Sequence, residues 1–287
     1  MQNGSSLDYI SDYNRSLIYM TSADKTPSSP SNTNFNISFL SGNTNLMKVK
    51  KFTLTSFSTN NLFNNIGSYN NTLGLYYQEI SPPSPSVPAF IVIPPNYYNA
   101  TQLAEMIQLT ARANYPVLSN MTCTFDTTTY KFTLTSGDSN VNIIIAPVIL
   151  GGGFQQRIES SLAYIMGFST LPSSESISIT ANTLPQLNIQ NIYLYSSRLS
   201  QNKSFRTNNN QSSTQTNLLL SIPLNITPYG GSVNWQQIGG GENQRSDLYY
   251  AIDNQIDQID FVLRDQYGNI LECPPNNNVN IEFIIQY

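Results

Sequence analysis

Apolar residues recur at every second position along much of the chain, which is typical of β-strands with one buried face. The pattern is clearest near the C-terminus, where Ile259, Phe261 and Leu263 alternate with polar residues. A second run begins at Val279 and alternates in the same way as far as Tyr287, the last residue of the sequence. We therefore expect both segments to be strands and Tyr287 to lie in the core.

Eight segments carry this pattern, and they are joined by long polar connections that contain proline. The predicted strands cover residues 16–20, 34–40, 46–57, 72–78, 189–196, 217–224, 258–264 and 280–287. The apolar phase changes within the third segment, which predicts a β-bulge at Lys50 and Lys51. The number of strands and the style of the loops predict a mainly β protein built on an eight-stranded single jelly roll, a form of β-sandwich. An immunoglobulin-like or up-and-down arrangement fits the same pattern.

The pattern changes after the proline-rich stretch at residues 81–88. Leu103, Met106, Ile107 and Ala111 have helical spacing, and Asn99 with Gln102 three residues later forms the signature of a capping box. A hairpin follows, with strands at residues 121–125 and 130–134 around the turn DTTT. A second, short helix is predicted at residues 158–168, with Gly167 as its C-terminal cap.

These segments divide the chain into three predicted parts. Residues 1–15 lack an apolar period and are expected to form a mobile arm that a partner orders. Residues 16–88 and 185–287 are expected to form the jelly-roll domain. Residues 89–184 are expected to form a small inserted α+β domain that consists of a helix, a hairpin and a second helix.

The composition excludes several classes of function. Only 10% of the residues are charged, and the formal net charge is −4. A sequence-independent nucleic-acid binder needs clustered basic residues, and the only cluster here is Lys48, Lys50 and Lys51, which a solvated strand edge explains. The N-terminal residues are too polar for a signal peptide, and no apolar run is long enough to span a bilayer. We therefore expect a protein that is made and kept in a reducing compartment.

The sequence contains no histidine, and this excludes serine–histidine and cysteine–histidine nucleophilic sites and histidine-bound zinc. The two cysteines, Cys123 and Cys273, are too few for a thiolate zinc site, and we expect free thiols. The glycine-rich stretches at Gly151 and Gly239 lack the lysine of a phosphate-binding loop. No catalytic, cofactor-binding or metal-binding residue is therefore predicted.

Carboxylates and the single tryptophan are the remaining candidates for chemistry. Asp253, Asp257 and Asp260 lack the spacing of an EF-hand, and a solvated face is the better interpretation. Trp235 follows the sequence PYGG and has two interpretations, a platform that stacks on a sugar ring or a loop residue buried at a subunit contact.

An ordered set of motifs covers nearly the whole chain, from about residue 17 to the C-terminus. The set comprises NYYNATQLAEMI, a hairpin, LAYIMGF, LPQLNIQNIYLYSSRL, LLLSIPLN followed by PYGG, and the final IDFVLRDQYGNILECPPNNNVNIEFIIQY. It resembles the penton, or minor capsid, proteins of virophages and polinton-like viruses, which belong to the double-jelly-roll virus lineage. The chain is too short for a double-jelly-roll major capsid protein.

This resemblance implies a structural protein of the virion, made in the host cytoplasm, that is not an enzyme. It implies a homo-pentamer that closes the fivefold vertices and contacts the major capsid protein, with the inserted domain facing outward. No integrin-type attachment motif is evident. The alternative hypothesis is a carbohydrate-binding jelly roll, such as a lectin-like attachment protein, that uses Trp235. A lyase or glycosidase is a third possibility, and no paired acid motif supports it.

Overall fold

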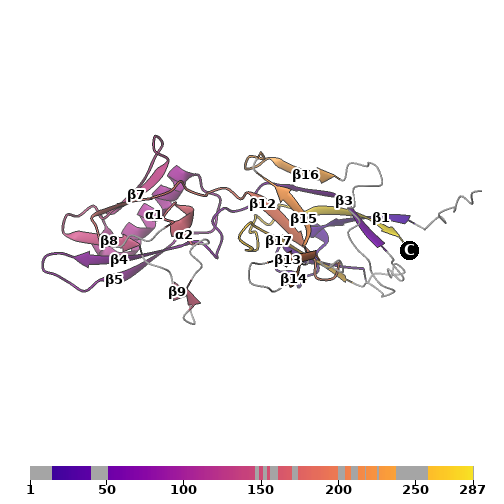
Figure 1. Cartoon of the computed structure of the whole chain (residues 1–287), viewed down its shortest axis with the longest axis horizontal. Coiled ribbons are helices and arrows are strands. Elements are labelled where there is room, and N and C mark those ends of the chain that lie inside the picture. Colours follow the sequence, from indigo (N-terminus) through magenta and orange to yellow (C-terminus); the bar gives the residue numbers. More distant parts are fainter. Residues whose placement is uncertain are drawn as a thin grey trace, which may run out of the picture. The chain divides into compact units, whose positions relative to one another are not determined.

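The computed structural model is mainly β, with antiparallel sheets and few helices (Figure 1). It describes residues 15–39, 51–145, 149–150, 154–155, 161–169, 174–199, 204–207, 213–216, 218–224, 226–236 and 258–286. The chain divides into two compact units. Unit 1 comprises Met1–Leu62, Gln190–Gln266 and Cys273–Tyr287, and unit 2 comprises Phe63–Ile189 and Tyr267–Glu272.

Unit 1 contains two four-stranded antiparallel sheets that pack face to face. One has the order β1 (Arg15–Thr21), β18 (Asn280–Gln286), β3 (Lys51–Asn60), β16 (Ser232–Gln236). The other has the order β15 (Leu218–Pro223), β12 (Asn191–Tyr195), β17 (Gln258–Arg264), β2 (Asn34–Ser38). Phe261 of the second sheet stacks on Phe283 of the first, with ring centroids 6.1 Å apart. Alternate residues of these strands therefore fill one core. The described residues of unit 1 also include the hairpin β13 (Ser204–Thr207) and β14 (Ser213–Thr216), and a 3-10 turn at Ser22–Asp24.

Strand β3 contains a β-bulge, but at Thr55 and not at the predicted position. Glu282 pairs with Ser56 and Phe283 pairs with Leu54, so Thr55 is the extra residue. Phe52 and Leu54 are buried before it, and Phe57 is buried after it. The Thr55 hydroxyl donates to the Glu282 carbonyl over 3.1 Å. Lys50, part of the predicted bulge, lies outside the described residues.

Unit 2 contains two three-stranded antiparallel sheets and a long helix. The first sheet has the order β5 (Val87–Val92), β4 (Thr72–Glu79), β8 (Val141–Ile145), and the second has the order β11 (Ser178–Thr180), β7 (Lys131–Thr135), β6 (Thr122–Asp126). An isolated bridge between Ile143 and Ser176 links them. Helix α1 (Ala100–Asn114) packs against both β5 and β6. The remaining elements are η2 (Pro116–Leu118), the short pair β9 (Ile149–Leu150) and β10 (Phe154–Gln155), and α2 (Leu162–Ile165).

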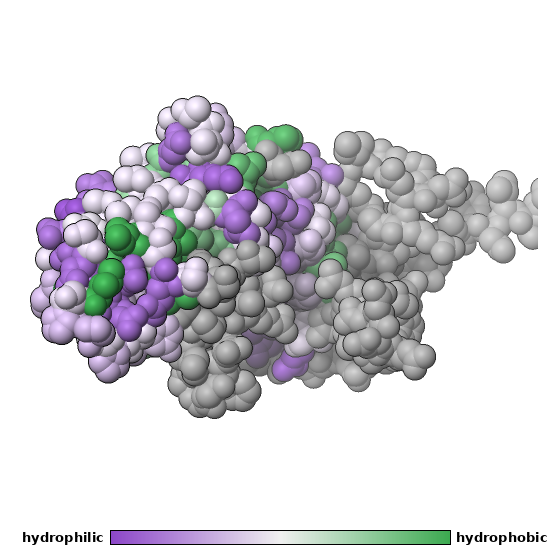
Figure 2. Space-filling model, turned by 60° about the vertical axis from the view of Figure 1, so that its left-hand side comes forward, coloured by the Kyte–Doolittle hydropathy of each residue, from purple (hydrophilic) through white to green (hydrophobic). Residues whose placement is uncertain are grey.

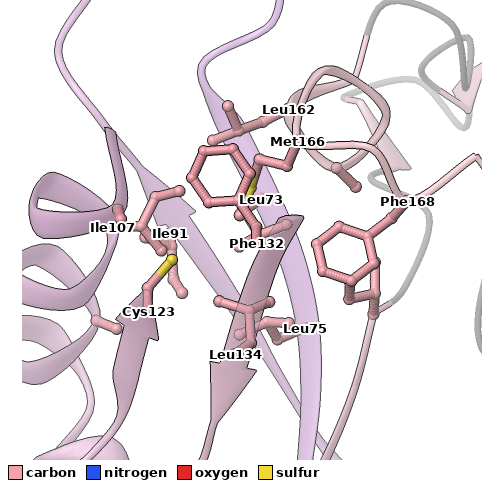
Figure 3. Packing of buried hydrophobic residues seen from close by; sticks show 14 of the residues in the cluster. Leu73, Leu75, Ile91, Ile107, Cys123, Phe132, Leu134, Leu162, Met166 and Phe168 are labelled. Carbon is pink, nitrogen blue, oxygen red and sulfur yellow. The ribbon is translucent and has the colours of Figure 1, made fainter. Parts of the chain in front are cut away.

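One hydrophobic core fills unit 2 (Figure 3). In the close view, Cys123 of β6 faces Ile91 and Ile107, and Phe132 of β7 lies near Leu162 and Met166. All of these residues belong to the same buried cluster. Both sheets and both helices therefore contribute to a single core.

The local predictions for this unit are confirmed. Asn99 and Gln102 form a complete capping box at the start of α1. β6 and β7 form the predicted hairpin, in which Cys123 pairs with Leu134. The second helix is shorter than predicted, and Gly167 follows it with a φ of 95°, a left-handed conformation that favours glycine.

One strand prediction is wrong in its placement, and one strand of the sandwich was not predicted. The predicted fourth strand of the sandwich is β4, which pairs with β5 and β8 in unit 2. The eighth strand of the two sheets of unit 1 is instead β16, which pairs with β3. Alternation shows that a segment has one buried face but not which sheet it joins. Unit 2 therefore begins at Phe63, before the predicted start at residue 89.

Candidate interaction surface

The acidic and cysteine side chains of the described residues do not form a metal-binding cluster. Among them no group of three or more cysteine, aspartate and glutamate residues could hold a metal ion. Asp260 lies on the outward phase of β17, as predicted, and has a structural role. Its carboxylate accepts hydrogen bonds from the Ser197 and Arg198 backbone amides, at 2.9 and 3.0 Å, and from the Ser196 hydroxyl. It thus fixes the turn after β12. Asp253 and Asp257 lie outside the described residues.

Trp235 lies in strand β16. The sequence interpretation that placed it in a loop is therefore wrong. The residue pairs with Phe57 of β3 and is half-buried. Val233, two residues earlier and on the same face, is buried. Trp235 therefore lies at the inner side of an edge strand, a position that favours packing over the stacking of an exposed sugar.

Both cysteines are free thiols. Burial raises the pKa of the Cys123 thiol to about 12, so the neutral form persists in the folded protein. Burial also raises the pKa of Cys273, and a hydrogen bond with Asn277 and the charge of Lys25 oppose this shift. Neither thiol is activated as a nucleophile. The glycine-rich stretches at 151–153 and 239–241, and Lys48 with Lys50, lie outside the described residues.

The outer face of the β5-β4-β8 sheet is the most unusual surface of the described residues. Its residues alternate with core residues such as Leu73 and Ile91, so they point away from the core. The apolar members of this face are Tyr76, Pro88, Phe90, Val92 and Ile144, and its other members are Thr72, Gly74, Gln78 and Asn142. Phe90 is 44% exposed and Val92 is 52% exposed. We call these nine residues the apolar face, and none of them is charged.

The register brings the apolar side chains together. Tyr76 of β4 lies directly between Pro88 of β5 and Ile144 of β8. Phe90 lies opposite Gly74, which has no side chain. Neighbours on the same face of an antiparallel sheet are within contact distance, so the apolar side chains form a continuous strip. An antiparallel sheet usually has a polar outer face, and exposed apolar patches mark contact sites.

The free edge of β5 is closed by a side chain from the end of α1. The Tyr115 hydroxyl accepts a hydrogen bond from the Phe90 amide at 2.7 Å and donates one to the Phe90 carbonyl at 3.1 Å. Both backbone groups of Phe90 thus point away from β4. The same alternation directs the nitrogen of Pro88 outward, where a residue without an N–H is tolerated. Tyr115 therefore blocks this edge against pairing with another strand.

The second sheet of unit 2 has an outer face of a different kind. It carries hydroxyl side chains at six positions, namely Thr122, Thr124, Thr133, Thr135, Ser178 and Thr180. Thr133 and Thr180 share a hydrogen bond of 3.0 Å, and Thr135 and Ser178 share one of 3.2 Å. We call these six residues the hydroxyl face. Its polar groups bond to one another, which is the ordinary arrangement of a solvated sheet.

Separate hydrophobic patches between hydrophilic residues are visible in the space-filling view (Figure 2). The sequence analysis missed the apolar face because it assigned no strand to the proline-rich stretch at residues 81–88 and the residues after it. A signal was present, since Ala89, Ile91 and Ile93 alternate and are buried in the structure. Once that strand is recognised, its alternate residues Pro88, Phe90 and Val92 are predicted to point to the outer face of the sheet.

Comparisons with known proteins give similarities to solved structures alone. No protein-family model matches the chain, and no curated protein matches it. A crystal structure of the selenomethionine-labelled mavirus penton protein aligns with a TM-score of 0.44 and 9% sequence identity, over 95% of this chain and 99% of that chain. Because a TM-score below 0.5 does not establish a shared fold, we base the proposed function on the strand order and the surfaces of this chain. No helix among the described residues is long and apolar enough to cross a membrane.

Proposed function

We propose that this chain is a structural capsid protein whose unit 1 is a single jelly roll. The strand order is the observation that carries the proposal. In chain order the strands of the two sheets are β1, β2, β3, β12, β15, β16, β17 and β18. The first, eighth, third and sixth form one sheet, and the fifth, fourth, seventh and second form the other. This interleaving supports a jelly roll, an architecture that viral capsid proteins use.

We further propose that five copies form a penton that contacts a major capsid protein. The surface supports an assembly role, because only 10% of the residues are charged and little repulsion opposes close packing of copies. The apolar face supports it as well, since a strip without charges is suited to contact with another protein. A fivefold ring is a closed head-to-tail assembly, in which two different surfaces of each copy meet.

The mass and shape of the purified particle test this proposal. Light scattering should give about five times the chain mass of 32.0 kDa, either for the protein alone or after co-expression with the double-jelly-roll major capsid protein of the same virus. Negative-stain images should then show fivefold rings. A strict monomer or dimer under both conditions would contradict the pentamer.

Glycan binding tests the alternative function. A lectin-like attachment protein should bind a glycan array, and the binding should be lost in Trp235→Ala. The half-buried position of Trp235 in β16 does not favour this result. The absence of any glycan signal, together with a pentameric mass, would leave the structural role as the function of the chain.

We also propose that unit 2 folds as an inserted domain. The chain enters it at Phe63 and leaves it at Ile189, and its buried residues form a cluster of their own. Limited proteolysis should leave a fragment close to residues 63–189, and cleavage distributed through α1 would contradict a separate domain. A cut in the 80–86 connection is expected to leave this fragment folded, because β4 and β5 are paired on either side of it.

A further inference from the structure

The apolar face of unit 2 exposes less surface than a stable protein contact needs. Tyr76 is 37% exposed, Phe90 is 44% exposed and Val92 is 52% exposed. Pro88 is exposed as well, and Ile144 is half-buried. An aromatic side chain can bury about 150–250 Å², so these five partly exposed residues together offer roughly 400 Å². A stable complex buries about 800 Å² on each partner. The apolar face is therefore too small to hold a partner by itself.

The small area restricts the kind of partner. A molecule that arrives from solution and has no other attachment needs the full area of a stable interface. A molecule that other contacts already hold in place does not, because its effective concentration at the face is high. In the proposed pentamer, each copy has two neighbours that are held in this way. The area thus favours a neighbouring copy over a free protein or peptide.

The charge of the chain also favours a contact between copies at this face. The formal net charge is −4, so two copies repel each other where their charged surfaces meet. The nine residues of the apolar face include no charged residue, so two copies can approach there without burying an unpaired charge. On the second sheet, by contrast, the outer phase continues to Asp126 and Lys131, which pair across β6 and β7.

Two aromatic residues of the face are held in position within the subunit. The Tyr115 hydroxyl bonds to both the amide and the carbonyl of Phe90. Tyr76 lies in the central strand β4, which pairs with β5 on one side and β8 on the other. Aromatic side chains on a fixed backbone lose little conformational freedom on binding, and they are enriched in the cores of interfaces. Tyr76 and Phe90 are thus suited to act as anchors.

We propose that the apolar face contacts a neighbouring copy of this chain in the pentamer, with Tyr76 and Phe90 as its anchors. This inference rests on the proposed pentamer. Because a ring is a head-to-tail assembly, the face meets a different surface of the neighbour. Because the face is too small to act alone, it strengthens an association that other surfaces of the two copies also support.

Sedimentation velocity over a range of protein concentrations tests this contact. Phe90→Asp places a carboxylate within the apolar strip and should raise the concentration of half-assembly about tenfold or more. Val92→Asp, at a more exposed position, should shift it in the same direction, and it replaces Phe90→Asp if circular dichroism shows that this variant does not fold. The matched control Thr133→Asp, on the hydroxyl face, should stay within about twofold of the original chain.

The outcomes separate this contact from the pentamer itself. Pentamers that form equally well with Phe90→Asp and Val92→Asp would overturn the contact between copies and leave the proposed function standing. If those pentamers no longer bind the major capsid protein, the face belongs to that protein and the inference is likewise overturned. An equal shift in Thr133→Asp would show a general effect of added charge and would also overturn it.

A chain that stays monomeric with and without the major capsid protein would contradict the pentamer. Sedimentation at about 1 mM, the range of weak contacts, then decides the contact between copies separately. Self-association that Phe90→Asp removes and Thr133→Asp retains would support this contact. Strictly monomeric behaviour at that concentration would overturn it.

Discussion

The apolar face and the hydroxyl face of unit 2 lie outside a single core. Their inner sides are alike, with fully buried Leu73 and Leu75 on β4 and fully buried Phe132 and Leu134 on β7. Their outer sides differ. One carries Phe90 and Val92 about half exposed, and the other carries threonine and serine hydroxyls that bond to one another. The need for a core sets the inner residues of both sheets, so only the outer residues can distinguish a contact surface from a solvated one.

The free edge of the sheet that carries the apolar face is a second distinguishing feature. The free edge of β5, beside the apolar face, is closed by Tyr115. An apolar sheet with an open edge is prone to edge-to-edge aggregation. With the edge closed, side chains rather than the backbone are left to make contact with a partner. The apolar face is thus arranged for association through its surface.

The largest expected effect concerns the core shared by the two faces. Phe132→Ala should lower the free energy of unfolding by about 3–5 kcal/mol, because it removes a fully buried ring and leaves a cavity. The neighbouring substitution Thr133→Ala, on the hydroxyl face, should cost less than about 0.5 kcal/mol. Urea unfolding followed by circular dichroism measures both. Equal effects would contradict the assignment of Phe132 to the inside and Thr133 to the outside.

A matched pair of charge insertions tests the outer faces directly. Phe90→Asp should reduce binding of the hydrophobic dye 8-anilinonaphthalene-1-sulfonate by the folded protein several-fold, because it breaks the apolar strip at an exposed position. Thr133→Asp on the hydroxyl face should leave dye binding unchanged. Fluorescence titration at equal protein concentration provides the comparison. Unchanged dye binding in Phe90→Asp would mean that other parts of the chain cover this face.

Removal of one hydroxyl group tests the closed edge of β5. Tyr115→Phe deletes both hydrogen bonds to Phe90 and should lower the free energy of unfolding by about 1–2 kcal/mol. The ring remains, so its packing near Tyr77 is retained. We expect the variant to aggregate more readily on storage, as measured by light scattering, because the edge is then open. A variant as stable and as monodisperse as the original chain would show that the hydroxyl does not protect the edge.

Local features of the fold could be predicted from the sequence, because neighbouring residues determine them. The capping box of α1 and the hairpin of β6 and β7 are of this kind. The placement of β4 could not be predicted, because alternation is the same in either unit. β16 was missed because it is a short edge strand in which Val233 and Trp235 are the only apolar residues.

The exclusion of histidine-dependent sites follows from the sequence alone, whereas the apolar face could not be predicted from it. The absence of histidine is a property of the composition and needs no structure. The apolar face combines the consecutive strands β4 and β5 with β8, which follows only after α1, β6 and β7. Strand β5 was not predicted because it contains Pro88, and a proline within an apolar run argues against a central strand. β5 is an edge strand, where proline is tolerated.

The smallest expected effect concerns the hydroxyl face itself. The double variant Thr133→Val and Thr180→Val removes a hydrogen bond of 3.0 Å and keeps the shape of both side chains. Stability should change by less than about 0.5 kcal/mol, because both partners of an exposed bond are lost together and valine suits a strand well. Dye binding should rise toward that of the apolar face, since the same sheet now exposes apolar groups. If it does not rise, apolar composition alone does not explain the difference between the two faces, and the continuity of the strip from Pro88 through Tyr76 to Ile144 is the property that matters.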